Sequence, residues 1–443
     1  MSTKTEQKIA RTLDLEIEGG RKLHGTIETN SSKNGAVALL CASLLNTGTT
    51  TLRHLPKIEE VNRLIEVLTS IGIKVTWKNH DVIIEPPKKL KLLNMNRVSA
   101  SRTRSIIMFI GPLLHSFKKF SIPQSGGCEL GVRTIRPHFQ ALKELGVEIK
   151  AKADKYEISY TKLKRAEIIL PESGDTATEN ALMAAALIKG KTIIKYASAN
   201  YMVQEVCFFL EKLGVKIDGI GTTTLTINGV SKISKNIEYT ISEDPTDSMF
   251  FIAAAAVTKS SLKITRCPID FLELELLTLK LMGFKFKILK RYKSYNGRTN
   301  LADIQTFPSK LISPLDKIHP RPYPGMNIDN IPFFAVIATQ AKGETLIHDW
   351  IYEKRALYYT ELDRLGANTT LADPHRFFVK GPTPLKAVEL LCPPALRPAT
   401  IILIAMLSAR GRSVLRNIYS INRGYENLVV RLNSLGAKVR ILE

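Results

Sequence analysis

Residues 428–441 read LVVRLNSLGAKVRI, which is an amphipathic run, a Leu-Gly turn and a short strand in succession. The apolar residues Leu428, Leu432 and Leu435 fall on one face of a helix, and Gly436 has the backbone freedom that commonly ends one. Successive turns of this kind lie 74, 68, 69, 83 and 70 residues apart, so the chain contains six related units. The five earlier turn glycines are Gly72, Gly146, Gly214, Gly283 and Gly366.

Each of the six units has the same order of elements. It opens with an apolar, alanine-rich run, which we expect to be a buried helix because apolar residues occupy all of its sides. A short strand, an amphipathic helix, the glycine turn and another short strand follow. A period of about seventy residues is longer than the 20 to 50 residues of solenoid repeats and indicates a small α/β module. The opening runs are residues 33–45, 104–114, 179–188, 247–257, 331–339 and 397–407.

Length and composition indicate a large protein without a membrane segment. A chain of 443 residues exceeds what one core usually supports, so we expect two domains of three modules each. No apolar run is long enough to cross a bilayer, so we expect no membrane insertion. Residues 1–14 are polar and lack the apolar core of a secretory signal, and we expect a disordered tail there. Five cysteines without a CxxC pair fit a reducing compartment, so the sequence predicts a cytoplasmic protein.

The net charge of +22, with a pI near 9.7, leaves three explanations open: a solvated lysine-rich surface, steering of an anionic substrate, or binding of nucleic acid. The sequence contains neither an aromatic RNA-binding motif nor a helix-turn-helix pattern, so we expect no specific nucleic acid partner. It also contains no metal-ligand spacing and no glycine-rich nucleotide loop of the Rossmann or Walker type. We therefore expect no metal and no organic cofactor.

Cationic residues stand where several helices are expected to begin. A helix N-terminus exposes unpaired N–H groups and a positive dipole, so it attracts anions and disfavours arginine. Each arginine could pair with a local carboxylate, but the repetition favours a clamp for phosphate and carboxylate groups. Lys33-Asn34, Arg104 and Arg397 stand at opening helices, and Arg133, Arg355 and Arg423 stand at second helices.

Six short motifs complete the pattern and occur in a fixed order. They are Lys33-Asn34-Gly35-Ala36, Gly126-Gly127-Cys128 with Gly131 and Arg133, Ala177-Thr178-Glu179-Asn180, Tyr323-Pro324-Gly325 leading to Asp329, Tyr352-Glu353-Lys354-Arg355, and Asn422-Arg423-Gly424-Tyr425-Glu426. This ordered set resembles the enolpyruvyl transferase family over residues 15–442, and within it the branch whose acceptor is UDP-N-acetylglucosamine.

The resemblance implies an α/β fold, a two-domain inside-out α/β barrel built from six βαβαββ repeats with the helices inside. It places residues 33–241 in the first domain and residues 15–32 with 242–443 in the second. The active site would lie in the cleft between the two domains.

The resemblance also implies a reaction: the enolpyruvyl group of phosphoenolpyruvate passes to the 3′-hydroxyl of UDP-N-acetylglucosamine, and phosphate is released. This is the first committed step of peptidoglycan synthesis. Cys128 matches the general acid and adduct residue, in a glycine-rich loop able to close over the site. Asp329 matches the carboxylate that accepts the hydroxyl proton, and the resemblance implies that Lys33 is a third catalytic residue.

The remaining implied contacts divide between the two substrates. Two of the catalytic residues have other readings: Cys128 as an inert buried thiol, and Asp329 as an N-cap for a helix from Ile331. Tyr352 could equally be a core or rim residue. The implied phosphoenolpyruvate contacts are Lys33, Asn34, Arg133, Arg355, Arg397 and Arg423, and the implied sugar-nucleotide contacts are Asn34, Arg104, Asp329, Ile351 and Tyr352.

The chain departs from the family pattern at several positions. Most of these departures fall where the acceptor would bind rather than where phosphoenolpyruvate would. An Asp at 175 would repel a diphosphate unless its side chain points away. The departures are Arg136 in place of an acid, Gly174-Asp175-Thr176 in place of Ser-Val-Gly, Asn327-Ile328 in place of Pro-Thr, and Asn200 and Ala395 at positions that are otherwise acidic.

Three hypotheses follow from these residues. The first is the enzyme that uses UDP-N-acetylglucosamine, and the second is a paralog with another hydroxylated, anionic acceptor. Shikimate 3-phosphate is disfavoured as that acceptor, because the cysteine loop and residues 422–426 resemble the sugar-nucleotide branch. The third is a non-catalytic basic binding protein. Retention of Lys33, Cys128, Asp329 and the arginines argues against it.

Overall fold

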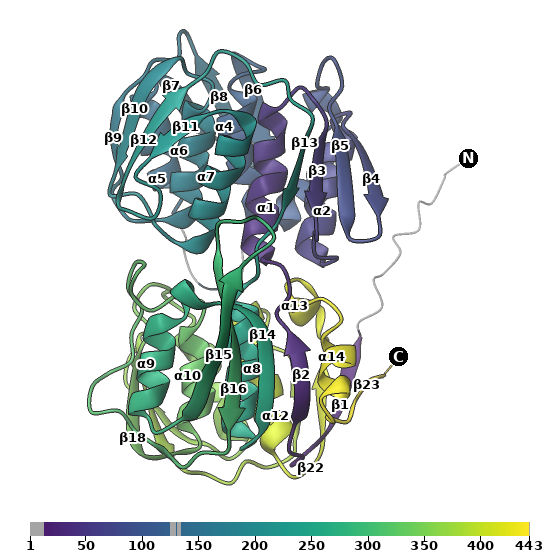
Figure 1. Ribbon diagram of the computed structural model, residues 1–443, viewed down its shortest axis with the longest axis vertical. Coiled ribbons are helices and arrows are strands. Elements are labelled where there is room, and N and C mark those ends of the chain that lie inside the picture. The colour runs from purple at the N-terminus through teal and green to yellow at the C-terminus, as the bar shows by residue number, and fades with distance from the viewer. Residues whose placement is uncertain (1–12, 125–129, 131–133, 443) are drawn as a thin grey trace.

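The computed structural model describes residues 13–124, 130 and 134–442. Its buried apolar side chains form two separate clusters. One cluster draws on residues 36–241, and the other on residues 15–27 and 249–439. In Figure 1 the helices and strands that carry the first cluster form the upper body, and those that carry the second form the lower body.

The opening helices form the centre of each body. All thirteen residues of α8 and all eight of α10 are buried, as apolar runs on every face of a helix predict. In the lower body α8, α10 and α12 contact one another, while the sheets lie outside them. The α-helices that fall near the predicted opening runs are α1 (Lys33–Ala42), α6 (Asp175–Ala185), α8 (Pro245–Val257), α10 (Ile331–Ala338) and α12 (Leu396–Ser408).

Two opening runs differ from the prediction. The second begins as a 3₁₀-helix, η3 (Arg104–Phe109), and only then becomes α4 (Ile110–Leu113). Pro112 explains this, because proline has no N–H to donate and its ring would clash with the carbonyl four residues earlier in a continuous α-helix. The third run, α6, begins at Asp175, four residues before the predicted start, with Gly174 in the N-cap position.

The second helices are less completely buried than the opening helices, and one of the three predicted arginine starts is wrong. Arg423 ends α13 (Tyr419–Asn422) instead of beginning a helix, whereas Arg355 is the N-cap of a 3₁₀-helix, η5 (Ala356–Thr360). Arg133 lies outside the described residues. The second helices are α2 (Glu59–Ser70), α5 (Arg136–Glu144), α7 (Tyr201–Leu213), α9 (Glu273–Leu281), α11 (Glu361–Arg364) and α14 (Leu428–Ser434), and α3 (Arg97–Arg102) is an additional short helix.

The strands of the described residues form six sheets, three in each body. The four-stranded sheets each contain one parallel pair, and their other pairs are antiparallel. The upper strands are β3 (Thr50–Arg53), β4 (Lys74–Lys78), β5 (Asp81–Glu85) with β13 (Ile237–Thr240); β6 (Lys119–Pro123), β7 (Val147–Ala151), β8 (Lys155–Tyr160); and β9 (Glu167–Ile169), β10 (Gly190–Lys195), β11 (Lys216–Asp218), β12 (Thr224–Gly229). The lower strands are β2 (His24–Glu28), β14 (Ser261–Pro268), β15 (Lys285–Lys293), β16 (Asn300–Phe307); β17 (Leu311–Ile312), β18 (Ala341–His348), β19 (Asn368–Leu371), β20 (Arg376–Gly381); and β1 (Asp14–Gly19), β21 (Glu389–Leu391), β22 (Gly411–Arg416), β23 (Val439–Leu442).

The glycine turns that define the repeat have the predicted conformation. All six turn glycines have a positive φ, from 81° at Gly283 to 103° at Gly214. An L-residue with a side chain is disfavoured in this region, so each helix stops there and the next strand turns back over it.

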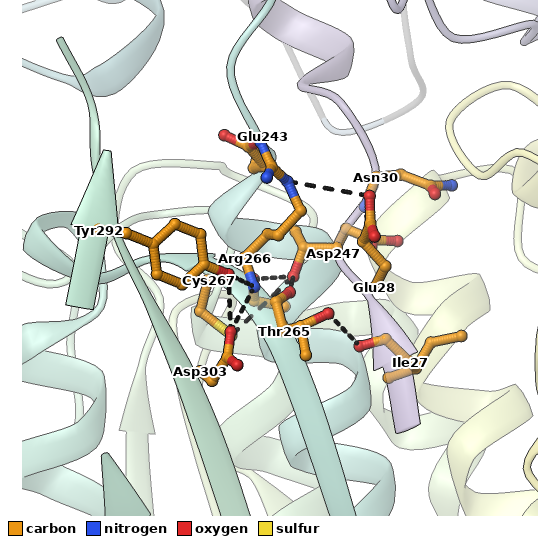
Figure 2. Close-up of polar contacts among 12 residues, drawn as sticks. Ile27, Glu28, Asn30, Glu243, Asp247, Thr265, Arg266, Cys267, Tyr292 and Asp303 are labelled. Atoms are coloured by element: carbon orange, nitrogen blue, oxygen red, sulfur yellow. Dashed lines mark hydrogen bonds and ion pairs between the residues drawn. The ribbon is translucent and has the colours of Figure 1, made fainter. Parts of the chain in front are cut away.

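The chain crosses between the two bodies in two adjacent segments. Ser31 on the first segment forms an antiparallel bridge with Glu243 on the second. Figure 2 shows Arg266 beside this crossing, where its Nε donates a 2.8 Å hydrogen bond to Glu243 and lies 3.8 Å from Glu28. Arg266 therefore links β14 to both crossing segments.

The backbone at Arg266 has an unusual conformation. Its φ is +60°, at a bulge in β14 where the register with β16 shifts. The Arg266 N–H donates to the Tyr292 hydroxyl at 3.0 Å, and that hydroxyl donates to Asp303 at 2.7 Å (Figure 2). These two strand residues hold the bulge in place.

The longest repeat interval, 83 residues, contains the longest hairpin arm. Strands β15 and β16 extend from the lower body toward α7 in the upper body (Figure 1). At the tip, Arg298 donates to Glu211 of α7 at 2.9 Å, and the Tyr295 and His54 rings lie 5.5 Å apart. The hairpin thus adds a noncovalent connection between the bodies.

Among the described residues, no helix is both long and apolar enough to cross a membrane.

Candidate active site

A cavity of about 450 Å³ is lined by residues of both bodies. Every predicted site residue that the structure describes lies on its wall. Cys128 and Arg133 lie outside the described residues. The predicted residues on the wall are Lys33, Asn34, Arg104, Asp329, Ile351, Tyr352, Arg355, Arg397 and Arg423.

Lys33 and Asn34 occupy the first turn of α1. The helix begins there because the Ser32 hydroxyl accepts a 2.9 Å hydrogen bond from the Gly35 N–H, which is an N-cap. Lys33 Nζ donates to Asn34 Oδ1 at 3.2 Å, and Asn34 Nδ2 donates to the Tyr201 hydroxyl at 3.1 Å. The cap thus orients a cation and an amide into the cavity.

Burial lowers the pKa of the Lys33 ammonium from its ordinary value. The Glu60 carboxylate opposes this effect, while the Arg397 and Arg423 charges add to it. A lysine among arginines in a buried wall is stabilised by an anion, so this group favours a negatively charged ligand beside it.

Asp329 and Arg397 form an ion pair across the lower body. Arg397 Nη2 lies 3.2 Å from Asp329 Oδ2 and donates to Thr246 Oγ1 at 2.9 Å, while Nη1 donates to the Tyr425 hydroxyl at 3.0 Å. Burial alone would raise the pKa of the Asp329 carboxyl, but the charges of Arg397, Arg355 and Lys33 outweigh burial and lower it. Asp329 is therefore ionised at neutral pH and able to accept a proton.

The alternative reading of Asp329 as a helix cap is wrong. Asn330 holds the N-cap position of α10, and its side chain makes no capping bond. The Asp329 carboxylate is directed to Arg397 instead.

Arg423 is held from the upper body although it belongs to the lower one. Its Nη2 donates to Glu60 Oε2 at 2.8 Å, and Glu60 also accepts a 2.5 Å hydrogen bond from Thr103. Burial raises the pKa of the Glu60 carboxyl, but the Lys33 and Arg423 charges lower it further than burial raises it. Glu60 is therefore an anion that links two cationic residues of the cavity wall.

Arg355 is fully buried and held by Asp349. Its Nε and Nη2 donate to the two Asp349 oxygens at 2.6 and 2.7 Å, and the Tyr359 hydroxyl donates to the same carboxylate at 2.6 Å. The guanidinium lies over the Tyr352 ring, 4.5 Å from its centroid. Within the described residues, Arg355 Nη1 is buried without a hydrogen-bond partner. That N–H is suited to an anionic oxygen in the cavity.

Comparison with known proteins identifies the chain's relatives. A family model described as EPSP synthase (3-phosphoshikimate 1-carboxyvinyltransferase) matches residues 17–432. The chain belongs to the enolpyruvyl transferase family. A curated relative of this enolpyruvyl transferase from Treponema denticola, named UDP-N-acetylglucosamine 1-carboxyvinyltransferase, is 36% identical over 430 residues, which cover 96% of this chain and 99% of the relative. A relative of the same name from Bradyrhizobium diazoefficiens is 32% identical over 424 residues, which cover 96% and 97%.

Solved structures of other enolpyruvyl transferases share the fold. The enolpyruvyl transferase NikO from Streptomyces tendae matches with a TM-score of 0.83 and 22% identity, covering 97% of this chain and 99% of that one. The EPSP synthase from Acinetobacter baumannii matches with a TM-score of 0.75 and 17% identity, covering 98% and 100%. The predicted fold class, an inside-out α/β barrel of six repeats, is confirmed.

The upper body adds further polar groups to the cavity lining. Arg104 Nη2 donates to the Thr134 carbonyl at 3.2 Å, and the buried His138 of α5 contacts Thr176 Oγ1 at 3.2 Å. From the lower body, Ile351 is 40% exposed, which leaves an apolar side chain open to a ligand. The lining therefore also presents hydrogen-bonding groups, a further guanidinium and an apolar side chain.

The departures at 175 and 200 lie together in the cavity lining of this enolpyruvyl transferase. Asp175 Oδ1 accepts from the Ser198 hydroxyl at 2.6 Å, and Oδ2 accepts from Asn200 Nδ2 at 3.3 Å. Asp175 also stands in the first turn of α6, where the helix dipole stabilises a carboxylate. Its negative charge is thereby stabilised within the protein by two hydrogen bonds and the helix dipole.

The other departures have different positions. Gly174 lines the cavity as the N-cap residue of α6, and Ala395 is buried at the start of α12 without a capping side chain. Arg136 is exposed on the first turn of α5 and is not among the described residues that line the cavity. The expected replacement of an acid by a base in the cavity wall is therefore wrong for Arg136.

Several residues in or beside the cavity wall were not predicted from the sequence. Glu60, Asp349 and Glu275 are buried carboxyls that hold other parts of the site. The alternative that each arginine pairs with a carboxylate is confirmed for Arg355, Arg397 and Arg423, and these three residues also line the cavity. The sequence signal was only that a buried arginine needs such a partner.

Proposed function

We propose that this enolpyruvyl transferase moves the enolpyruvyl group of phosphoenolpyruvate onto the 3′-hydroxyl of UDP-N-acetylglucosamine and releases phosphate. One observation carries the proposal: the cations, the ionised carboxylate and the aromatic residue that this reaction requires line a single cavity. The names of relatives 36% and 32% identical over nearly the whole chain support the choice of acceptor.

The cationic wall suits phosphoenolpyruvate. Lys33, Arg397 and Arg423 converge there, and guanidinium groups bind phosphate and carboxylate oxygens with paired N–H donors. Arg355 also lines the cavity, and its Nη1 has no hydrogen-bond partner in the part of the chain that the structure describes, so we assign this N–H to the carboxylate of the substrate. Arg133, which resembles a further phosphate contact, would complete the clamp.

The reaction needs a proton donor and a proton acceptor. The acceptor oxygen forms a bond to C2 of phosphoenolpyruvate while C3 takes up a proton. Loss of phosphate from C2 and of a proton from C3 then restores the double bond. We assign removal of the hydroxyl proton to Asp329, which is ionised. We assign delivery of the C3 proton to Cys128, on the resemblance of its glycine-rich loop.

Other residues of the cavity lining would bind the sugar nucleotide. Arg104 provides charge for the diphosphate, Asn34 an amide for the sugar, and Ile351 with Tyr352 an apolar and aromatic surface for the sugar and base. The carboxylate of Asp175 is engaged by Ser198 and Asn200, which lessens its repulsion of a diphosphate.

The same proposal covers the organisation and place of the protein. We assign residues 33–241 to one domain and residues 15–32 with 242–443 to the other, which the two apolar clusters support. The substrates are small cytosolic metabolites, so we place the protein in the cytoplasm. There it would serve peptidoglycan synthesis and, through it, cell shape and division.

The test is phosphate release from phosphoenolpyruvate by the purified protein with UDP-N-acetylglucosamine. We expect turnover with this acceptor and none with shikimate 3-phosphate. Turnover only with a different acceptor would overturn the proposal in favour of a paralog. Asp175, which departs from the family pattern, is the reason to test other acceptors. Binding of both substrates without turnover would favour a non-catalytic binding protein.

A further inference from the structure

Glu275 is a buried carboxyl that the proposed reaction does not use. It lies in the first turn of α9, is 2% exposed, and reaches the edge of the cavity. Its Oε1 accepts two hydrogen bonds, from the Asn327 backbone N–H at 3.0 Å and from Asn330 Nδ2 at 2.8 Å. One carboxylate oxygen thus holds both ends of a four-residue segment.

That segment carries Asp329. The Asp329 N–H donates to Asn327 Oδ1 at 2.9 Å, and the Asn330 N–H donates to the Asn327 carbonyl at 3.0 Å, which closes a turn. From within this turn, the Asp329 carboxylate pairs with Arg397 at 3.2 Å. A chain of contacts therefore runs from Glu275 through the turn to the carboxylate that faces the cavity.

The sequence of the turn explains why it needs this support. Where the family pattern has Pro-Thr, this chain has Asn327-Ile328. Proline fixes φ and has no N–H, whereas asparagine leaves φ free and adds an N–H that must find an acceptor when buried. The helix cap does not supply the support, because the Asn330 side chain makes no capping bond to α10. Glu275 supplies the missing acceptor.

We propose that Glu275 is a positioning residue that fixes the turn bearing Asp329 through Asn327 and Asn330, in place of a rigid proline. The role rests on the proposed function, in which Asp329 takes the proton of the acceptor hydroxyl. Burial raises the pKa of the Glu275 carboxyl, whereas the bonds from Asn330 and Asn327 oppose that rise. Burying a carboxyl is costly unless it is hydrogen-bonded, so the two bonds from the turn help to stabilise Glu275 in its buried position.

Three variants separate the effect of the Glu275 acceptor oxygen from the effect of side-chain size. Glu275→Gln keeps an oxygen that can accept both bonds, so its turnover should stay within about threefold of wild type. Glu275→Leu keeps the size and removes the acceptor, and we expect kcat to fall by about 10- to 100-fold with the KM for phosphoenolpyruvate little changed. Glu275→Asp keeps the charge but is too short to hold both donors, so it should fall between the two.

Hydrogen exchange gives a readout that does not depend on turnover. The Asn327 and Asp329 amides are hydrogen-bonded within the turn, so the segment 326–332 should exchange faster in Glu275→Leu than in wild type or Glu275→Gln. Equal exchange in all three proteins would overturn the positioning role, whether or not the enzyme is active. If Glu275→Leu does not fold, the same comparison is made with Glu275→Asp.

The two proposals fail in different ways. Absence of turnover by wild type with UDP-N-acetylglucosamine would refute the proposed function, and hydrogen exchange would still decide whether Glu275 holds the turn. An active wild type with an equally active Glu275→Leu would refute the positioning role alone. So would a fall in turnover in Glu275→Leu that Glu275→Gln shares, because Gln retains the acceptor oxygen.

Discussion

The side-chain amide of Asn200 donates a 3.3 Å hydrogen bond to the carboxylate of Asp175. Asp175 and Asn200 are two of the positions where the chain departs from the family pattern, and they were identified separately in the sequence. In space they form one arrangement with a single negative charge and a single amide donor. The loss of an acid at 200 is thus accompanied by an acid at 175, so the local charge is kept.

Asn200→Asp should destabilise the protein in a pH-dependent way. It replaces a donor with a second carboxylate beside Asp175, and the unfolding free energy at neutral pH should fall by about 1 to 3 kcal/mol. The pair then binds a proton more readily when folded than when unfolded, so the loss should shrink as pH falls from 8 toward 5. Urea unfolding at several pH values measures it.

The matched control is Asn200→Ser, which keeps a hydroxyl able to cap α7 but adds no charge. Its stability should lack the pH-dependent component. If the two variants showed the same dependence on pH, charge repulsion at Asp175 would be excluded as the cause.

Asp329→Asn should lower kcat by about 10²- to 10⁴-fold, because an amide cannot accept the proton of the acceptor hydroxyl. The lowered pKa of Asp329 keeps the wild-type carboxylate ionised down to below its ordinary value of 3.8. The active form is present above the folded pKa and lost only as pH falls through it. Wild-type turnover should therefore show no acid limb from Asp329 between pH 5 and 8. Carbon-13 NMR of labelled aspartates can locate this titration directly.

Alkylation should distinguish Cys128 from the other cysteines. Cys41, Cys207, Cys267 and Cys392 are buried, and burial raises their pKa, to about 12 for Cys267 and Cys392. A neutral buried thiol is a poor nucleophile. The loop of Cys128 resembles the family loop whose cysteine the epoxide fosfomycin alkylates, so we expect this reagent to label Cys128 in the native protein. Peptide mass spectrometry that found the label only at another cysteine would contradict the assignment, and Cys128→Ala should lose both label and turnover.

Asp349→Asn tests the support of Arg355. The variant leaves a fully buried guanidinium without its counter-charge, and the unfolding free energy should fall by about 3 to 5 kcal/mol. Activity should fall as well, with a higher KM for phosphoenolpyruvate. Asp373→Asn removes the partner of Arg376 in an exposed pair and should cost less than about 1 kcal/mol. Equal losses of unfolding free energy in the two variants would mean that burial does not determine how much the Asp349–Arg355 pair contributes to stability.

The sequence was most informative where a residue's own pattern carries the information. The turn glycines and the all-apolar opening runs were each visible locally, and the turns and most of the opening helices are where they were expected. The predicted helix start at Arg423 is wrong, because this residue ends α13. Pro112 interrupted one helix, an effect that the apolar pattern could not show because period and backbone chemistry are separate constraints.

Partnership between distant residues could not be predicted in the same way. Glu60 and Arg423 are 363 residues apart and meet only because the two bodies face each other. Glu275 lay within an amphipathic run and gave no sign that it holds the turn of Asp329. Such pairs depend on tertiary packing, which leaves no period or spacing in a single sequence.

Arg266 offers a test of the crossing between the bodies, because its backbone and its side chain can be separated. Its φ of +60° is disfavoured for a residue with a Cβ, while its guanidinium pairs with Glu243 (Figure 2). Arg266→Ala and Arg266→Gly both remove the guanidinium, but only glycine is free of the steric cost. We expect Arg266→Gly to be more stable than Arg266→Ala by about 1 kcal/mol, and both to be less stable than wild type. Thermal and urea unfolding of the three proteins measure this difference. Equal stability of the two variants would show that the left-handed backbone is not retained once the Glu243 pair is gone.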